Sequence, residues 1–205
     1  MLVTIEGIDG SGKSSLVLSL HTLLSDLSPV FTREPGSTWV GDQVRRAVAE
    51  KADPITEALL FAADHAAHLS TLVRPSLERG LLVISDRYSD SRYAYQQETL
   101  KGYIDDPLAW LRALHAGWTV CPDLTFLIVL PVDEALSRIK EKQNREHFEN
   151  HRLLEKVQDQ YLALAKSDPS RFVLVDGTKD EGEIAGFVAG VIRDAFGRSR
   201  SHRRP

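Results

Sequence analysis

The chain has 205 residues and a formal net charge of −4, with 42% hydrophobic and 26% charged residues. This composition is typical of a single globular domain with a hydrophobic core. The acidic balance argues against a nucleic-acid-binding protein, and no apolar run reaches the roughly 20 residues that a membrane-spanning helix needs. The one cysteine, Cys121, excludes an internal disulfide, and the N-terminus lacks the pattern of a secretory signal, so we expect a cytoplasmic protein.

Short apolar runs rich in branched residues alternate with longer helix-like segments along the chain. The runs predict five strands, at 2–6, 29–32, 81–85, 124–130 and 172–176. The segments between and after them predict helices at 13–26, 41–50, 55–79, 106–117, 133–143, 150–167 and 180–196. This alternation is typical of an α/β fold in which helices cover both faces of a five-stranded parallel sheet.

We interpret residues 1–197 as one domain without an internal linker. Apolar spacing thins in the polar stretch at about 140–152, which we expect to form a short lid. The last residues, 198–205, hold four arginines and are predicted to be a basic tail without fixed structure.

The segment GIDGSGKS, from Gly7 to Ser14, matches the phosphate-binding P-loop motif G-x-x-x-x-G-K-[ST]. It lies between a predicted strand and a predicted helix, which is the context that the motif requires. Glycines let the backbone curl around an anion, the helix N-terminus adds a partial positive charge, and Lys13 adds a full one. The predicted ATP-binding residues are Gly7, Ile8, Asp9, Gly10, Ser11, Gly12, Lys13, Ser14 and Ser15.

Asp86 and Arg87 follow directly after the predicted strand at 81–85. The carboxylate of Asp86 and the hydroxyl of Ser14 together predict a Mg²⁺ site. Arg87 would lie at the carboxyl end of a parallel strand, where it can hold a second phosphate with two hydrogen bonds. The alternative is a surface ion pair between the two residues. The chain has no N-K-x-D guanine signature, which disfavours a GTPase.

Six segments, in order along nearly the whole chain, make the sequence similar to the thymidylate kinase family. They are IEGIDGSGKSS (5–15), TREPGST (32–38), LLFAADHAAH (59–68), ISDRYSDSRYAYQ (84–96), PDLTFLIVLPVDEALSRI (122–139) and FVLVDG (172–177). The resemblance implies a P-loop NTPase fold and transfer of the γ-phosphoryl group of ATP to dTMP with Mg²⁺. It also implies a homodimer.

The resemblance assigns roles to residues that the motifs alone leave open. It implies that Asp9 reaches the sugar 3′-hydroxyl of the acceptor, that thymine stacks on Phe61, and that Tyr95 packs under the deoxyribose. Arg87 and Arg45 would bind the acceptor phosphate, although the neighbouring Arg46 can replace Arg45 in the alignment. From the residues alone, Asp9 also suits a helix N-terminus, and Phe61 also suits an ordinary core position.

Phosphoryl transfer needs positive charge on the moving group. Some thymidylate kinases carry a basic residue inside the P-loop, but Gly10 and Ser11 stand at those positions here. The resemblance therefore implies an arginine from the lid, for which Arg145 is the best candidate, with Lys142 and Lys140 behind it; Glu149 matches an acidic lid position. A zinc pair at His147 and His151 is not expected, because no third ligand is evident.

Two acceptor-binding positions depart from the family pattern. His65 stands where the family has an arginine that bonds the thymine carbonyl, and Arg92 stands where it has serine, threonine or asparagine. Either Arg92 takes over that carbonyl, or the pocket prefers another pyrimidine nucleotide such as dUMP or dCMP. A nucleotide-dependent switch without an acceptor is a further alternative, disfavoured by Asp9 and Arg87.

Overall fold

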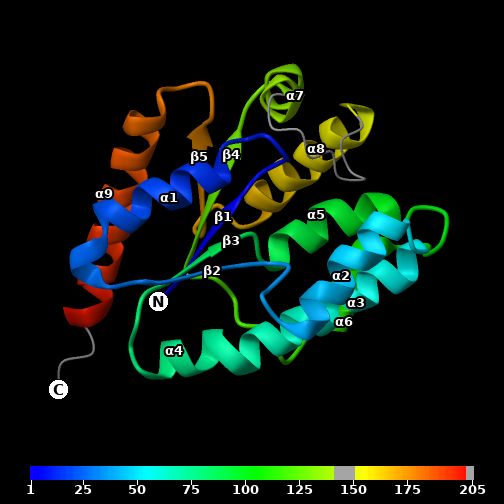
Figure 1. The fold of residues 1–205 in the computed structure, drawn as a ribbon, viewed down its shortest axis with the longest axis horizontal. Coiled ribbons are helices and arrows are strands. Elements are labelled where there is room, and N and C mark those ends of the chain that lie inside the picture. The colour runs from blue at the N-terminus through cyan, green and yellow to red at the C-terminus, as the bar shows by residue number, and fades with distance from the viewer. Residues whose placement is uncertain (141–150, 202–205) are drawn as a thin grey trace.

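The computed structural model describes residues 1–140 and 151–201, which form five strands and a set of helices (Figure 1). All strand pairs are parallel, and the sheet order is β2-β3-β1-β4-β5. The strands are β1 (Leu2–Glu6), β2 (Val30–Arg33), β3 (Val83–Asp86), β4 (Leu124–Val129) and β5 (Phe172–Asp176). The predicted α/β fold with a five-stranded parallel sheet is confirmed.

The helices connect these strands. They are α1 (Lys13–Leu23), η1 (Ser25–Leu27), α2 (Trp39–Glu50), α3 (Pro54–His68), η2 (Leu69–Val73), α4 (Arg74–Glu78), α5 (Ser89–Thr99), α6 (Pro107–His115), α7 (Val132–Lys140), α8 (His151–Ser167) and α9 (Glu181–Ser201). Among the described residues, no helix is both long enough and apolar enough to cross a membrane.

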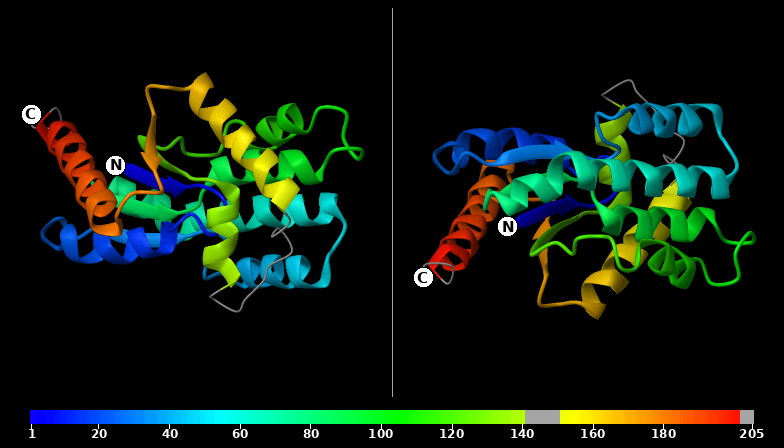
Figure 2. Two further views of the ribbon diagram at one scale, coloured as in Figure 1. Left: turned by 90° about the horizontal axis from the view of Figure 1, so that it is seen from above. Right: turned by 90° about the horizontal axis from the view of Figure 1, so that it is seen from below.

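Helices cover the sheet from two sides. Helices α1 and α9 pack together on one side, where Leu16 and Leu20 of α1 join Val188 and Ile192 of α9 in a buried cluster with β1 and β4 side chains. Helices α5 and α8 pack together on the other side, as the views in Figure 2 show. Strands β1, β3 and β4 are largely buried between two helical layers, which explains why their sequences are mostly apolar.

Helices α2, α3, α5 and α6 gather beyond the carboxyl ends of the strands (Figure 1). The P-loop follows β1, and Arg87 follows β3, so both emerge on this edge of the sheet. In open parallel sheets this edge is where ligands bind. The fold therefore places the two predicted phosphate sites on adjacent strands, with the helical group beside them.

Three features of the helices differ from the sequence-based expectations. No helix was predicted at α5, whose face toward the rest of the protein is built from polar side chains instead of an apolar stripe. The segment at 55–79 is helical throughout but widens into the π-helical turn η2 ahead of Pro75, which cannot donate a backbone hydrogen bond. Helix α9 continues to Ser201, so residues 198–201 are helical.

Candidate active site

The P-loop curls at three glycines with positive φ angles, which are 144° at Gly7, 79° at Gly10 and 95° at Gly12. A Cβ atom at Gly7 would lie 2.7 Å from the carbonyl oxygen of Ile128, and one at Gly10 would lie 2.1 Å from that of Ala135. Conformation and space both exclude side chains at these positions. The main chain itself therefore forms the surface that a phosphate would meet.

Lys13 begins α1, and its side chain is buried against the loop. Its Nζ atom donates to the carbonyl oxygen of Ile8 at 2.7 Å and to the hydroxyl of Ser11 at 3.3 Å. Burial and the charge of Arg87 lower the pKa of Lys13 to about 8, although nearby carboxylates act in the opposite direction. The ammonium group is thus held by loop oxygens, which phosphate oxygens can replace.

Ser14 and Asp86 meet at the carboxyl ends of β1 and β3. In the sheet Ile5 lies opposite Asp86, and the Ser14 hydroxyl donates to Asp86 Oδ2 at 3.2 Å. Among the described residues, no group of three or more His, Cys, Asp or Glu side chains is arranged to hold a metal ion. One hydroxyl and one carboxylate beside a phosphate loop do fit Mg²⁺, which completes its oxygen shell with substrate phosphates and waters.

Arg87 follows β3 with a φ angle of 64°, a left-handed conformation that is uncommon for a residue with a side chain. Its Nη1 atom donates to the carbonyl oxygen of Gly7 at 3.2 Å and to the Ser91 hydroxyl at 3.1 Å. Its Nη2 atom pairs with Asp9, and the guanidinium carbon lies 5.1 Å from the ring centre of Tyr95. These contacts fix a full positive charge beside the P-loop.

Asp9 places an acid inside a loop that otherwise suits anions. Its Oδ1 accepts from Arg87, and its Oδ2 accepts from the Tyr95 hydroxyl at 2.8 Å. Burial would raise the pKa of Asp9, but the charges of Arg87 and Lys13 outweigh burial and lower it. The carboxylate is therefore ionised near neutral pH, and the chain itself supplies the cation that stabilises it.

Glu6 is a buried acid that the sequence analysis did not identify. It accepts from the backbone amide of Tyr88 at 2.8 Å, from the Ser91 hydroxyl at 2.6 Å and from the Tyr161 hydroxyl at 2.9 Å. Burial and the nearby Asp90 raise its pKa to about 7. Since Tyr161 belongs to α8, these bonds connect that helix to the residues around Arg87.

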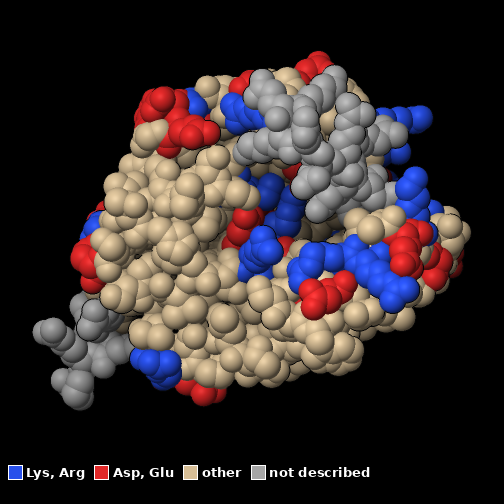
Figure 3. Space-filling model, in the orientation of Figure 1, with Lys and Arg blue, Asp and Glu red and all other residues tan. Residues whose placement is uncertain are grey.

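A pocket next to the Asp9–Arg87 pair lies between the P-loop, the β2–α2 loop, α3 and α5. On the face shown in Figure 3, Lys and Arg side chains gather around a hollow near the centre of the view. Of the residues predicted to bind the acceptor, the pocket brings together Asp9, Phe61, Arg87, Arg92 and Tyr95. It is also lined by five residues that the sequence analysis did not identify, namely Glu34, Pro35, Tyr88, Ser91 and Gln96.

The structure does not bring His65 to this pocket, although the sequence predicted it there. Its side chain is fully buried. Nδ1 lies 2.7 Å from Glu34 Oε1, and Nε2 lies 2.7 Å from the Thr119 hydroxyl. Burial and the charge of Arg92 lower the pKa of His65 to about 4, so the ring is neutral. Both ring nitrogens of His65 are therefore engaged by these two partners.

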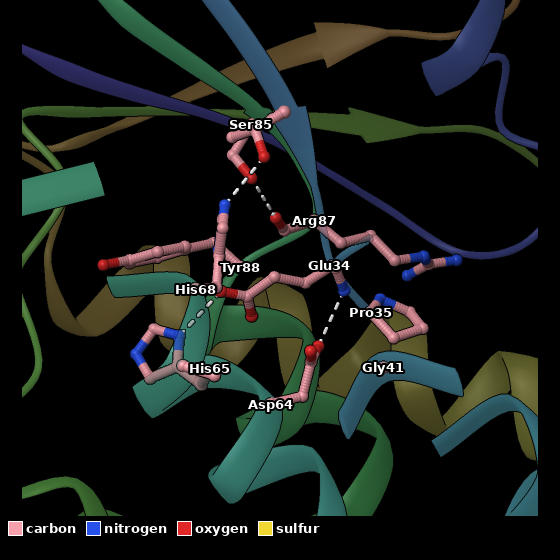
Figure 4. A network of polar contacts seen from close by, with 12 residues as sticks. Glu34, Pro35, Gly41, Asp64, His65, His68, Ser85, Arg87 and Tyr88 are labelled. Carbon is pink, nitrogen blue, oxygen red and sulfur yellow. Dashed lines mark hydrogen bonds and ion pairs between the residues drawn. The ribbon is translucent and has the colours of Figure 1, made fainter. Parts of the chain in front are cut away.

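His65 belongs to a group of polar side chains behind the pocket, which we call the buried cluster. Figure 4 shows His65 and His68 of α3 close to Glu34 of the β2–α2 loop, while the Arg87 side chain extends away from them. Arg92 of α5 pairs with Glu34 and donates to His115 of α6. The members of the buried cluster are Glu34, His65, His68, Arg92 and His115.

The proposed phosphate ligand Arg45 lies on the surface of α2, outside the pocket. It pairs with Asp42 at 2.6 Å and donates to the carbonyl oxygen of Gly36 at 3.1 Å. Arg46 forms an exposed pair with Glu50 at 2.8 Å. Arg45 Nη1 also donates to the carbonyl oxygen of Pro35, a residue that lines the pocket, at 3.3 Å. Neither Arg45 nor Arg46 lines the pocket itself.

The predicted lid arginine, Arg145, lies outside the described residues, as do Lys142, His147 and Glu149. A described cation next to the P-loop is Arg138 of α7, which the sequence analysis did not consider. It donates to Glu134 at 2.5 Å and to the carbonyl oxygen of Gly177 at 3.0 Å. Its Nη1 would lie 3.7 Å from a Cβ atom at Gly12. His151, at the start of α8, pairs with Asp133.

Comparison with known proteins agrees with this arrangement. The family model described as thymidylate kinase matches residues 5–186. The chain belongs to the thymidylate kinase family. It is 60% identical, over 205 residues that cover all of this chain and 99% of the relative, to a "Probable thymidylate kinase" of Methanoculleus marisnigri. A relative of the same name from Methanospirillum hungatei is 57% identical, covering 96% of this chain and 95% of its own.

A third "Probable thymidylate kinase", from Methanocorpusculum labreanum, is 53% identical over 94% of this chain and 98% of its own length. The matched range contains every described site residue, from the P-loop to the buried cluster. In this chain His65 and Arg92 are connected through their shared partner, Glu34. Helix α5 could have been predicted from the spacing of polar and aromatic residues at 91, 92, 95 and 96, since a helix brings these positions to one face.

Proposed function

We propose that this chain transfers the γ-phosphoryl group of ATP to dTMP, giving ADP and dTDP. The observation that carries the proposal is the pairing of two phosphate-binding elements on adjacent strands. Lys13 and the P-loop follow β1, Arg87 follows β3, and Asp9 contacts Arg87 between them. A protein that only binds one nucleotide has no use for the second cation.

The roles of the residues follow from charge and position. Lys13 would bind the β- and γ-phosphates, and Arg87 would bind the acceptor phosphate. Ser14 and Asp86 would hold Mg²⁺, which neutralises charge on the ATP phosphates when bound. The acceptor phosphate is already an oxyanion at neutral pH, so no general base is needed. Catalysis therefore consists of alignment and charge compensation.

The nucleoside part of the acceptor would lie farther along the same pocket. Phe61 offers an aromatic face on which a base would stack. Tyr95, whose hydroxyl donates to Asp9, would pack under the deoxyribose. Asp9 is proposed to bond the sugar 3′-hydroxyl while it keeps Arg87 in place. Arg45 and Arg145 remain the proposed cations for the acceptor phosphate and the transferred group.

We also infer from the family resemblance that the chain forms a homodimer. Trp39 of α2 is 77% exposed and Leu59 of α3 is 46% exposed, and the two helices pack side by side. This apolar surface suits contact with a second copy of the chain.

The test is ADP release from ATP and Mg²⁺ in a coupled assay, with dTMP, dUMP, dCMP or no acceptor present. We expect dTMP to stimulate ADP release most strongly. Greatest stimulation by dUMP or dCMP would favour a kinase for another pyrimidine nucleotide. Tight ATP binding with no stimulation by any acceptor would overturn the proposal in favour of a nucleotide-dependent switch.

A further inference from the structure

Arg92 lines the pocket, and its guanidinium group is buried. Not all of the hydrogen-bond donors of this group have a partner in the described residues. Only 2% of the residue is exposed. Its Nε donates to His115 Nε2 at 3.0 Å, and its Nη1 pairs with Glu34 Oε2. Its Nη2 is also buried and has no hydrogen-bond partner in the part of the chain that the structure describes. A buried donor of this kind is destabilising unless a ligand satisfies it.

The remaining members of the buried cluster fix the orientation of this guanidinium group. Glu34 Oε1 accepts from His65 and His68, so Oε2 is directed to Arg92. His115 donates through Nδ1 to the carbonyl oxygen of Leu111 at 2.7 Å, which leaves Nε2 as the acceptor for Arg92. A planar guanidinium group held at two of its nitrogens has a fixed third nitrogen.

The free nitrogen of Arg92 can only donate, because arginine has no acceptor. Its ligand must therefore present an acceptor such as a carbonyl oxygen. Thymine and uracil carry an oxygen at C4, whereas cytosine carries an amino group there, which is also a donor. Two facing donors cannot form a hydrogen bond, so this position discriminates between the bases.

The position of Arg92 in the pocket selects which edge of the base it meets. Arg87 contacts Gly7, Asp9 and Ser91, and Arg92 contacts Glu34 and His115. These two sets of partners do not overlap, so the arginines are held in separate regions of the pocket. In a pyrimidine nucleotide C4 lies opposite N1, the atom that carries the sugar and phosphate. With the phosphate at Arg87, the C4 edge is the part of the base farthest from it.

We propose that Arg92 determines base specificity by donating a hydrogen bond from Nη2 to the 4-oxygen of the acceptor base. Glu34 and His115 are positioning residues that hold the guanidinium group. This inference rests on the proposed phosphorylation of a pyrimidine nucleotide. It assigns the base-reading function to α5 and explains why His65 is turned away from the pocket.

The test combines a substrate change with a protein change. The value of kcat/KM is measured for dTMP, for dCMP and for the dTMP analogue in which hydrogen replaces the 4-oxygen. In the wild-type chain, removal of the 4-oxygen is expected to lower kcat/KM about 10- to 100-fold, because it leaves the charged donor unpaired. In Arg92→Lys, which keeps the charge but loses the fixed fork, the same removal is expected to change kcat/KM less than about threefold.

The variant is also expected to narrow the preference for dTMP over dCMP by about 10-fold or more. Arg112→Lys is the matched control, since Arg112 is exposed on α6, and it is expected to keep the wild-type ratios. A purely structural role for Arg92 would lower activity toward all three substrates equally. Should Arg92→Lys fail to fold, the double variant Glu34→Gln/Arg92→Leu removes both buried charges together and is measured in its place.

An equal effect of removing the 4-oxygen in wild type and variant would overturn the inference. So would a wild-type chain that uses the analogue as well as dTMP. In both cases acceptor-stimulated ADP release with dTMP would leave the proposed function standing. Absence of that release in the wild-type chain would overturn the proposed function itself, and the inference with it.

Discussion

The two ends of the pocket are built in different ways. The phosphate end consists of the P-loop and Arg87, and it is formed by consecutive residues at the ends of two adjacent strands. The base end is lined by Phe61, Glu34 and Arg92. Behind it lies the rest of the buried cluster, whose members come from the β2–α2 loop, α3, α5 and α6. At the phosphate end much of the binding surface is main chain, whereas at the base end it is side chain.

This difference has an electrostatic counterpart. At the phosphate end Lys13 and Arg87 place two cations beside the carboxylates of Asp9 and Asp86. At the base end a single carboxylate, Glu34, balances a single guanidinium group, and burial with the charge of Arg92 lowers the pKa values of His65 and His115 to about 4. Cations held beside a phosphate loop suit phosphates, and a balanced, buried network suits an uncharged base.

The largest effect is expected at the phosphate end, from Lys13→Ala. Loss of one positioned cation from phosphoryl transfer is expected to lower kcat about 100- to 1,000-fold. The KM for dTMP should change little, because the acceptor phosphate is proposed to be bound by Arg87. Steady-state kinetics with ATP and dTMP measure both values.

The matched control is Lys166→Ala, which removes an exposed lysine of α8. It is expected to keep the wild-type kcat. A comparable decrease in kcat in both variants would contradict the role of Lys13 in phosphoryl transfer. A large rise in the KM for dTMP in Lys13→Ala alone would contradict the proposal that Arg87 binds the acceptor phosphate.

A smaller effect is expected at the base end from Phe61→Ala. Loss of a stacking surface costs about 1–3 kcal/mol, which corresponds to a rise of about 5- to 150-fold in the KM for dTMP. The decrease in kcat should be smaller, because the reacting groups are at the other end of the pocket. Phe187→Ala, which removes a phenylalanine of α9 that is 51% exposed, is the matched control. An unchanged KM in Phe61→Ala would show that Phe61 is only a packing residue.

The smallest effect concerns the pH dependence of stability. The folded chain lowers the pKa of His115 from 6.5 to about 4 through burial and the charge of Arg92. Between these pH values the unfolded chain binds a proton that the folded chain does not, so His115 makes the chain less stable as the pH falls from 6.5 toward 4. His115→Gln keeps an acceptor for Arg92 and does not titrate.

We therefore expect the free energy of unfolding of wild type, relative to His115→Gln, to fall by about 1–3 kcal/mol between pH 7 and pH 4.5. The difference between the two chains is the useful quantity, because Glu6 and Glu57, whose pKa values burial raises to about 7, act in the opposite sense over the same range. Chemical denaturation at several pH values measures it. His151→Gln, at an exposed residue, is the control, and parallel profiles for wild type and His115→Gln would refute a buried neutral imidazole.

Prediction from sequence succeeded where the signal is local. All five strands are present within one or two residues of their predicted limits. The three central strands, β1, β3 and β4, are largely buried, and burial on both faces requires a mostly apolar run. The P-loop motif identified the phosphate end, because its conformation depends on glycines at fixed spacing. Helix α5 was missed, since its inward face carries Arg92, Tyr95 and Gln96, which bond with or line a pocket instead of packing as an apolar stripe.

The sequence by itself determined the fold class, the P-loop and the family, because these depend on apolar periodicity and on motifs of adjacent residues. Tertiary structure decided the base end. His65 and Arg92 are 27 positions apart, and Glu34 is their common partner. The contact with Glu34 keeps His65 out of the pocket and holds Arg92 at the pocket wall. A buried carboxylate must be paired by nearby donors. Which donors reach it depends on how α3, α5 and α6 pack together.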